Sequence, residues 1–139
     1  MKLNTTSQYA IRVVTYLAIN NDKLSNSKAI SDELEIPYKS LTRIITQLVN
    51  ASIIISLRGR DGGIKLEKEL ASIKVYDILE AVNESLHKEE CILGIGACNK
   101  HDKCPLHDRW IVPKEEIINI FQNTSLDDLN KTNCTIKIR

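Results

Sequence analysis

The sequence SKAISDELEIPYKSLTRIITQLVNASIIISLRGRDGGIKL, residues 27–66, decides the fold. Its first part predicts a short helix over 27–34 that is capped by Asn26 or Ser27, because either side chain can accept a hydrogen bond from the first free amides. Pro37 cannot continue that helix but can open the next one, so a tight turn is expected between two helices. The apolar residues of the short helix predict its inner face: Ala29, Ile30 and Leu34.

A longer helix is predicted over 38–50, with one apolar side and one cationic side. Apolar residues at spacings i, i+3, i+4 and i+7 predict the side that faces the core: Leu41, Ile44, Ile45 and Leu48. The opposite side has cations and hydroxyls and no acid: Lys39, Thr42, Arg43 and Thr46. Together with a mostly apolar helix over 5–19, this arrangement is typical of a helix-turn-helix. Base edges of double-stranded DNA would then be reached by the start and outer side of this helix, through Tyr38, Lys39, Thr42 and Arg43.

A β-hairpin is predicted directly after the helix-turn-helix. Strands are expected over 53–57 and 64–66, and Asp61-Gly62 in the connecting tip is a strong signal for a tight turn. A basic hairpin in this position is typical of the wing of a winged helix, where Arg58 and Arg60 would reach phosphates or a minor groove. The alternative is a helical protein-interaction domain with an ordinary hairpin.

Composition is consistent with a cytoplasmic protein that binds a polyanion. The chain has 139 residues and is 42% hydrophobic, which is enough for one domain or for a small domain with an appendage. It has no apolar stretch long enough for a transmembrane helix and no pattern of a signal peptide, so its thiols should stay reduced. Residues 1–66 carry nine Lys and Arg against five Asp and Glu, whereas residues 67–139 carry ten against thirteen. The basic first half predicts a polyanionic partner.

Three cysteines and a histidine follow one another as Cys91-x6-Cys98-x5-Cys104-x2-His107. Thiolates and imidazole suit either a closed zinc site or an iron–sulfur cluster. The gaps of six and five contain no Cys-x2-Cys pair of the kind that zinc sites usually show, and this favours a cluster. Buried free cysteines, or one disulfide with a cysteine left over, are the metal-free alternative. Three further residues are expected to be bystanders: Cys134, His87 and His101. The alternative for His101, which lies between two of the cysteines, is that it acts as a substitute ligand.

The C-terminal half predicts further helices around this cysteine segment. Ser72 is expected to cap a helix that ends near Asn83, with four inward residues: Val75, Ile78, Leu79 and Val82. Pro105 can open a long helix, in which Pro113 predicts a kink or a break. A short capped turn is expected over 125–129. The large apolar residues of the long helix, Trp110, Ile117 and Phe121, predict burial against a second copy of the chain, with packing within one chain as the alternative.

The predicted fold class is therefore mainly α with a small β-hairpin wing, a winged helix-turn-helix followed by a C-terminal dimerisation helix. The expected domains are a DNA-binding domain over 1–84, a cysteine-rich cluster-binding loop over 85–108, a dimerisation helix with a short terminal turn over 109–130, and a tail over 131–139. No catalytic triad spacing, phosphate-binding glycine loop or His-Glu-x-x-His helix occurs, so the chain is not expected to be an enzyme.

Three stretches also resemble a known family. They are the opening Met1-Lys2-Leu3 with Tyr9-Ala10-Ile11-Arg12, the wing Arg58-Gly59-x-x-Gly62-Gly63, and the run from Cys91 to Cys104-Pro105-Leu106-His107-x2-Trp110. They resemble the bacterial winged-helix iron–sulfur transcription regulators that include IscR and NsrR. The resemblance implies a homodimer in which the long C-terminal helix crosses to the partner, with a cluster near the interface and a pseudo-palindromic operator.

The resemblance also implies a ligand set. In IscR-like members three cysteines and a histidine hold a [2Fe-2S] cluster, and Cys91, Cys98, Cys104 and His107 match those positions. In NsrR-like members an aspartate of the partner's first helix completes a [4Fe-4S] site, and Gln8, a poor ligand, stands at the matching position here. This favours His107 and [2Fe-2S], with [4Fe-4S] left open.

The predicted function is a DNA-binding transcription regulator whose promoter binding depends on that cluster and that senses redox state, nitric oxide or iron–sulfur status. The alternative is a zinc-stabilised or metal-free winged-helix module for DNA or protein interaction, without sensing.

Overall fold

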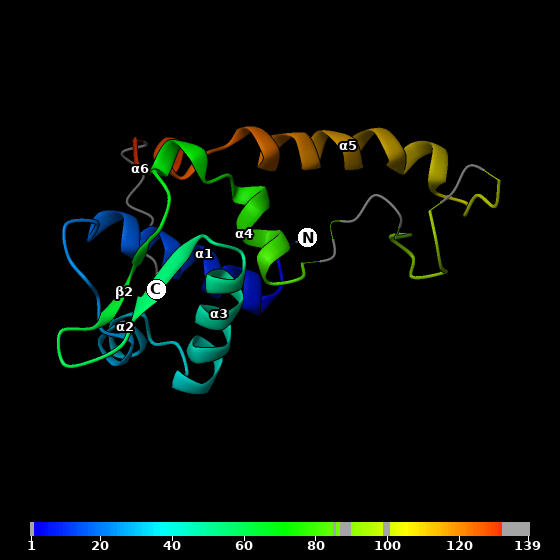
Figure 1. The fold of residues 1–139 in the computed structure, drawn as a ribbon. Coiled ribbons are helices and arrows are strands. Elements are labelled where there is room, and N and C mark those ends of the chain that lie inside the picture. Colours follow the sequence, from blue (N-terminus) through cyan, green and yellow to red (C-terminus); the bar gives the residue numbers. More distant parts are fainter. Residues whose placement is uncertain (1, 85, 87–89, 99–100, 132–139) are drawn as a thin grey trace.

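The computed structural model describes residues 2–84, 86, 90–98 and 101–131, and Figure 1 shows how they are arranged. The elements follow in the order α1 (Thr5–Ile19), α2 (Ser27–Leu34), α3 (Tyr38–Asn50), β1 (Ile54–Leu57), β2 (Gly63–Leu66), the 3-10 helix η1 (Leu70–Ser72), α4 (Val75–Ala81), α5 (His107–Asn123) and α6 (Leu126–Lys131). The mainly helical fold with a two-stranded hairpin is confirmed. Each boundary predicted between residues 5 and 66 lies within one residue of the observed one.

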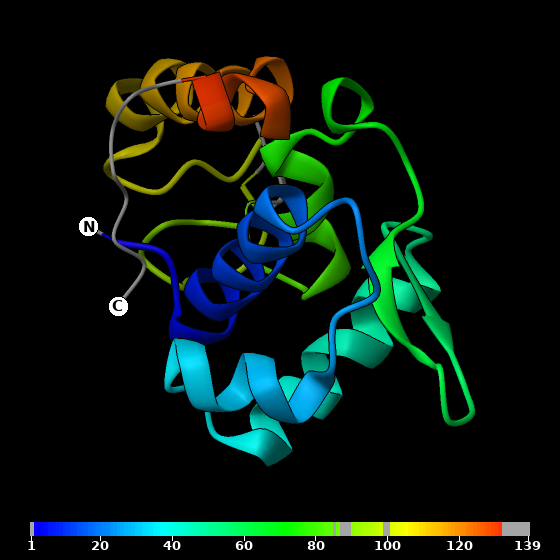
Figure 2. The ribbon, with the colours of Figure 1, turned by 90° about the vertical axis from the view of Figure 1, so that its left-hand side faces the viewer.

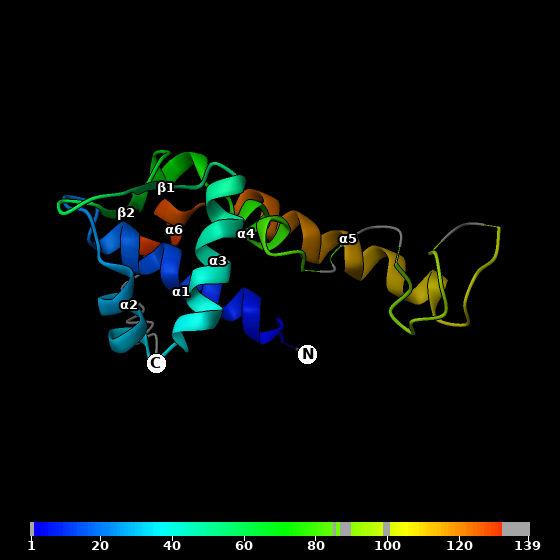
Figure 3. The ribbon, with the colours of Figure 1, turned by 60° about the horizontal axis from the view of Figure 1, so that its bottom comes forward.

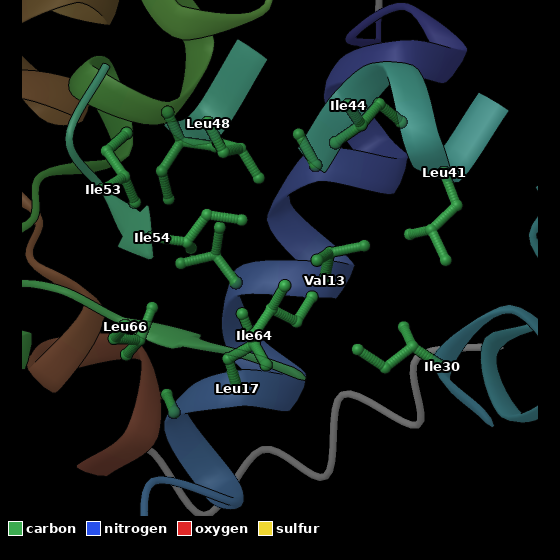
Figure 4. Packing of buried hydrophobic residues seen from close by; sticks show 14 of the residues in the cluster. Val13, Leu17, Ile30, Leu41, Ile44, Leu48, Ile53, Ile54, Ile64 and Leu66 are labelled. Carbon is green, nitrogen blue, oxygen red and sulfur yellow. The ribbon is translucent and has the colours of Figure 1, made fainter. Parts of the chain in front are cut away.

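The core lies between α1, α2, α3 and the hairpin. Figure 4 shows how the fully buried Val13 and Leu17 of α1 meet Ile30 of α2 and residues of α3 and the strands, among them Leu41, Leu48, Ile54 and Ile64. The predicted inner faces are confirmed, except that Ile45 is half-buried and Ala29 is exposed. Ser31 occupies the buried side of α2 instead, because its hydroxyl donates to the Ile36 carbonyl at 2.7 Å.

Polar side chains fix both ends of α2. Asn26 is the N-cap, and its side chain accepts from the amides of Lys28 and Ala29 at 2.8 and 3.2 Å. At the other end Glu35 takes a left-handed conformation with φ of 52°, and the Arg12 guanidinium donates to the Leu34 carbonyl at 2.5 Å. The hydrogen bond to a C-terminal carbonyl of α2 explains why a charged residue, Arg12, stands within the otherwise apolar sequence of α1.

The hairpin is held in register by its own ladder and by the loop before α2. Ile54 pairs with Leu66 and Leu57 pairs with Gly63, while Ser25 and Ile64 exchange amide-to-carbonyl hydrogen bonds of 2.9 Å. At the tip, a Cβ on Gly62 would lie 2.1 Å from the Leu57 carbonyl oxygen, so this position admits only glycine. The tip projects from the body of the molecule, as Figure 2 shows.

The prediction that Ser72 caps the next helix is wrong. Residues 70–72 form η1, in which the Ser72 hydroxyl donates back to the Glu69 carbonyl, and α4 begins only after Lys74. The Asp77 carboxylate then accepts the Lys74 amide at 2.9 Å. The capped turn predicted near residue 125 is confirmed, because Ser125 and Asp128 bond each other's amides through their side chains before and within α6.

Helix α5 begins at His107, two residues after Pro105, and continues through Pro113. Of the predicted kink or break at Pro113, the break is therefore wrong. Pro113 removes the amide that would donate to the Arg109 carbonyl, and both residues are exposed. In Figures 1 and 3, α5 projects beyond the body formed by α1 to α4 and has the cysteine segment at its far end. None of the helices in the described part of the chain is long and apolar enough to cross a membrane.

Candidate metal centre and nucleic-acid interface

The first two cysteines lie at the ends of a loop that closes on itself. Glu90 and Ala97 form an isolated antiparallel bridge, and the Cys91 amide donates to the Gly96 carbonyl at 3.0 Å. Gly94 and Gly96 make the return possible, because their φ angles of 68° and 115° are in the range that favours glycine. Cys91 and Cys98 therefore follow directly the two residues at the base of this loop.

The other two candidate ligands lie at the start of α5. Cys104 accepts the amide of His107 on its carbonyl at 3.0 Å, and His107 is the first residue of the helix and only 6% exposed. The His107 Nδ1 is 3.3 Å from the Cys98 Sγ, so the loop and the helix meet at this pair. Cys98 and His107 thus combine a thiol and an imidazole from two different segments.

The thiols of Cys91 and Cys104 form a second pair. The pKa of Cys91 is lowered, first because the Leu93 amide donates to its sulfur and then because the Cys104 thiol does. The pKa of Cys104 is raised, first because its thiol donates to Cys91 and then because burial disfavours the thiolate. Of the two thiols, Cys91 therefore has the lower pKa and is the first to become a thiolate.

The donor set fits an iron–sulfur cluster in its chemistry. The three described cysteines are free thiols, and backbone amides already point at one sulfur, as they do around bound clusters. The four predicted ligands form two pairs, Cys91 with Cys104 and Cys98 with His107. Among the residues that the structure describes, no group of three or more His, Cys, Asp or Glu is arranged to hold a single metal ion.

The remaining candidates contribute little to this picture. His101 is exposed, while His87 and Cys134 lie outside the described residues. The Gln8 side-chain amide donates to the Leu3 carbonyl at 2.6 Å, a local bond within the start of α1. The ring of His107, in contrast, lies 3.3 Å from the Cys98 sulfur.

A groove of about 480 Å³ runs beside the cysteine segment. Its walls come from α5, from Glu84 and Leu86 after α4, from the N-terminal residues and from the start of the cysteine loop. They include the predicted apolar row Trp110, Ile117 and Phe121. All three residues of that row are half-buried within one chain. Sequence reasoning missed Lys114, which also lines the groove and is only 9% exposed. The sequence feature that could have identified Lys114 is its position seven residues after His107, which places both on the same side of the helix.

The predicted DNA-reading residues of α3 share one exposed side of the helix. Tyr38 is 48% exposed, and Lys39, Thr42 and Arg43 are exposed as well. Their neighbour Lys28, at the start of α2, was not predicted. Its ammonium lies 5.9 Å from the centre of the Tyr38 ring and 3.0 Å from the Asp32 carboxylate. A cation thus stands beside the first residue of α3.

Arg58 and Arg60 lie at the exposed tip of the wing. Strand β1 follows α3 directly and contacts it, so the wing is held against the helix that carries Lys39 and Arg43. In Figure 3, the hairpin begins at the upper end of α3 and extends to the left from there. Cations on both elements are therefore available to one elongated polyanion.

Comparison with known proteins gives consistent matches along the chain. The profile of Rrf2, described as an iron-dependent transcriptional regulator, matches residues 3–132. The HTH-type transcriptional regulator IscR of Klebsiella pneumoniae is 30% identical over 130 residues, which cover 93% of this chain and 79% of that protein.

Two solved structures share the fold. CymR, the global cysteine regulator of B. subtilis, superposes with a TM-score of 0.77 at 21% identity and covers 93% of this chain and 95% of its own. IscR of T. potens superposes with a TM-score of 0.74 at 23% identity and covers 94% of this chain and 87% of its own.

Proposed function

The chain belongs to the Rrf2 family of transcriptional regulators, and from this membership we propose that an iron–sulfur cluster controls its binding to promoter DNA in the cytoplasm. As a member of this family it is a DNA-binding transcriptional regulator and not an enzyme. The observation that carries the cluster proposal is the contact between the Cys98 sulfur and the buried His107 imidazole at 3.3 Å.

Cys91, Cys98, Cys104 and His107 are the proposed ligands. A bound cluster would supply a centre that oxidants, nitric oxide or a shortage of iron and sulfide can alter. The amides of Leu93 and Ile95 stabilise negative charge on the Cys91 sulfur, which is the charge that a ligating thiolate carries. The half-buried Cys98 and the buried His107 are screened from water in the same region.

His107 as the fourth ligand favours a [2Fe-2S] cluster over a [4Fe-4S] cluster. Its ring already lies beside Cys98, whereas the Gln8 side chain bonds the carbonyl of Leu3. The proposal predicts that reduced protein gives a histidine nitrogen signal in pulsed electron paramagnetic resonance, and that His107→Ala removes the signal and most of the cluster. An unchanged spectrum in His107→Ala would mean that another residue is the fourth ligand. Gln8→Ala tests the alternative position and should leave the spectrum unchanged if His107 is the ligand.

The path from the cluster segment to the DNA-binding side is short. Helix α5 begins within the ligand set and packs on α4, and α4 contacts both α1 and α3. A cluster that orders the cysteine loop and the start of α5 stabilises one placement of these helices over another. Its loss would shift that equilibrium by the difference in stabilisation between the two placements.

The central experiment is purification under anaerobic conditions, followed by iron and acid-labile sulfide analysis. We expect coloured protein with iron and sulfide in equal amounts, because the ligand set lacks the Cys-x2-Cys pairs usual for zinc. Stoichiometric zinc without sulfide would instead support the zinc-stabilised module. Protein free of both would support the metal-free one, with DNA binding intact in either case.

A homodimer on α5 is part of the proposal. Val112 and Ile120 are 56% and 61% exposed on this projecting helix, which also carries the half-buried row of Trp110, Ile117 and Phe121. Light scattering should give a dimer at micromolar concentration. Ile120→Lys should shift it toward monomer, because a charge would be buried without a partner. Asn119→Lys, an exposed polar position on the same helix, is the control. A monomeric wild-type chain would contradict the dimer.

A further inference from the structure

Lys114 is a charged side chain that α5 turns inward. The helix has three buried residues, His107, Lys114 and Ile118, at spacings of seven and four, so they share one side of the helix. A lysine is almost never this deeply buried unless its ammonium has a partner. Here the ammonium donates to the Glu90 carbonyl oxygen at 2.8 Å.

Glu90 is the residue at which the cysteine loop closes. It precedes Cys91 and pairs with Ala97, the residue before Cys98. A hydrogen bond to its carbonyl therefore reaches the base of the loop, next to both cysteines. The other end of the lysine is fixed on α5, two helical turns after His107 and ten residues after Cys104.

We propose that Lys114 is a positioning residue that joins the two halves of the ligand set, the loop with Cys91 and Cys98 and the helix start with Cys104 and His107. The part of the inference that concerns a bound cluster rests on the proposed function. The geometric part, that Lys114 holds the loop against α5, rests on the hydrogen bond, the burial and the bridge alone.

The positive charge of Lys114 has a second consequence. A cluster held by three thiolates carries net negative charge, and a buried cation nearby offsets that charge. Loss of the cation would disfavour reduction, so the reduction potential of a bound cluster should fall in Lys114→Met. A side chain that served only to fill the groove would leave the potential unchanged when methionine replaces it, because methionine retains the apolar stem.

The first test uses the protein without a cluster. Reduced wild-type, Lys114→Met, Lys114→Arg and Arg109→Met are treated with iodoacetamide at a pH at which Cys91 is fully thiolate in all four proteins, because Lys114 also lowers the pKa of this thiol. The alkylation rate at each cysteine is read by mass spectrometry. Arg109→Met is the matched control, because it removes an exposed cation from the same helix. Alkylation of Cys91, which is 9% exposed, should accelerate about tenfold or more in Lys114→Met, return toward wild type in Lys114→Arg, and stay unchanged in the control.

The second test uses the cluster-loaded protein. Release of iron to a chelator should be about 10- to 100-fold faster in Lys114→Met, the usual effect of removing an outer partner of a ligand set. Lys114→Arg should restore slow release. If Lys114→Met unfolds, Lys114→Gln, which keeps a shorter neutral donor, replaces it in both tests.

The two tests separate this inference from the proposed function. If Cys91 in cluster-free Lys114→Met is alkylated at the wild-type rate, the inference is overturned, even if the anaerobic wild-type protein contains a cluster. A wild-type chain without iron and sulfide would overturn the proposed function, and the alkylation rates would still decide whether Lys114 holds the loop.

Discussion

Replacement of Cys91, Cys98 or Cys104 by alanine should reduce iron and sulfide in the anaerobically prepared protein to background. Each thiolate is one of only four proposed ligands, and alanine offers no donor in its place. The loss should be complete for Cys98→Ala, because this sulfur also holds the His107 ring at 3.3 Å. The measurement is iron and sulfide per chain, together with the absorption spectrum.

Cys134→Ala is the matched control, since it removes a cysteine outside the proposed ligand set. It should keep full iron and sulfide content. The folded state should persist in all four variants, because the core between α1, α2, α3 and the hairpin contains none of these residues. Far-ultraviolet circular dichroism checks this. Full cluster content in any of the three ligand variants would remove that cysteine from the proposed set.

The winged helix-turn-helix was predictable because its signals are local. The period of Leu41, Ile44 and Leu48 defines one side of α3, and Asn26 and Pro37 mark where helices begin. The hairpin follows from a turn that tolerates only Gly62 at its tip. These features require only neighbouring residues, and the tertiary structure agrees with each of them.

The errors arose where neighbours in space decide the local structure. Ser72 is a good capping residue, but η1 uses its hydroxyl and α4 begins later. Pro113 would break many helices, yet α5 continues through it, with Pro113 and Arg109 both exposed. Neither outcome is visible in the spacing of apolar residues.

The candidate site was predictable as a set of donors but not as an arrangement. The spacing of the cysteines and His107 identifies four ligands, whereas their association as two pairs depends on how the loop closes at Glu90 and Ala97. Lys114 shows the same limit in another form. A lysine in a helix is normally solvated, and only the contact with the Glu90 carbonyl reveals its role.

Arg43→Ala should weaken binding to the specific operator by about 1–3 kcal/mol, roughly 5- to 150-fold, while binding to scrambled DNA changes little. The reason is that an exposed arginine on the outer side of α3 can form two hydrogen bonds with guanine in a major groove. Tyr38, Lys39 and Thr42 share this side, so their alanine variants should also lower the preference for the operator. The measurement is fluorescence anisotropy with both DNA duplexes at one fixed salt concentration.

Arg58→Ala combined with Arg60→Ala should weaken binding to every sequence and flatten its dependence on salt. Both residues lie at the exposed tip of the wing, where charge meets phosphate or a narrow minor groove. Each lost phosphate contact should lower the salt slope by about 1. Arg109→Ala, an exposed cation on the distant part of α5, should leave affinity and slope unchanged. If the wing variant behaves like this control, the wing does not contact DNA. If Arg43→Ala also leaves operator affinity unchanged, neither α3 nor the wing contacts DNA, and both predicted contact surfaces are wrong.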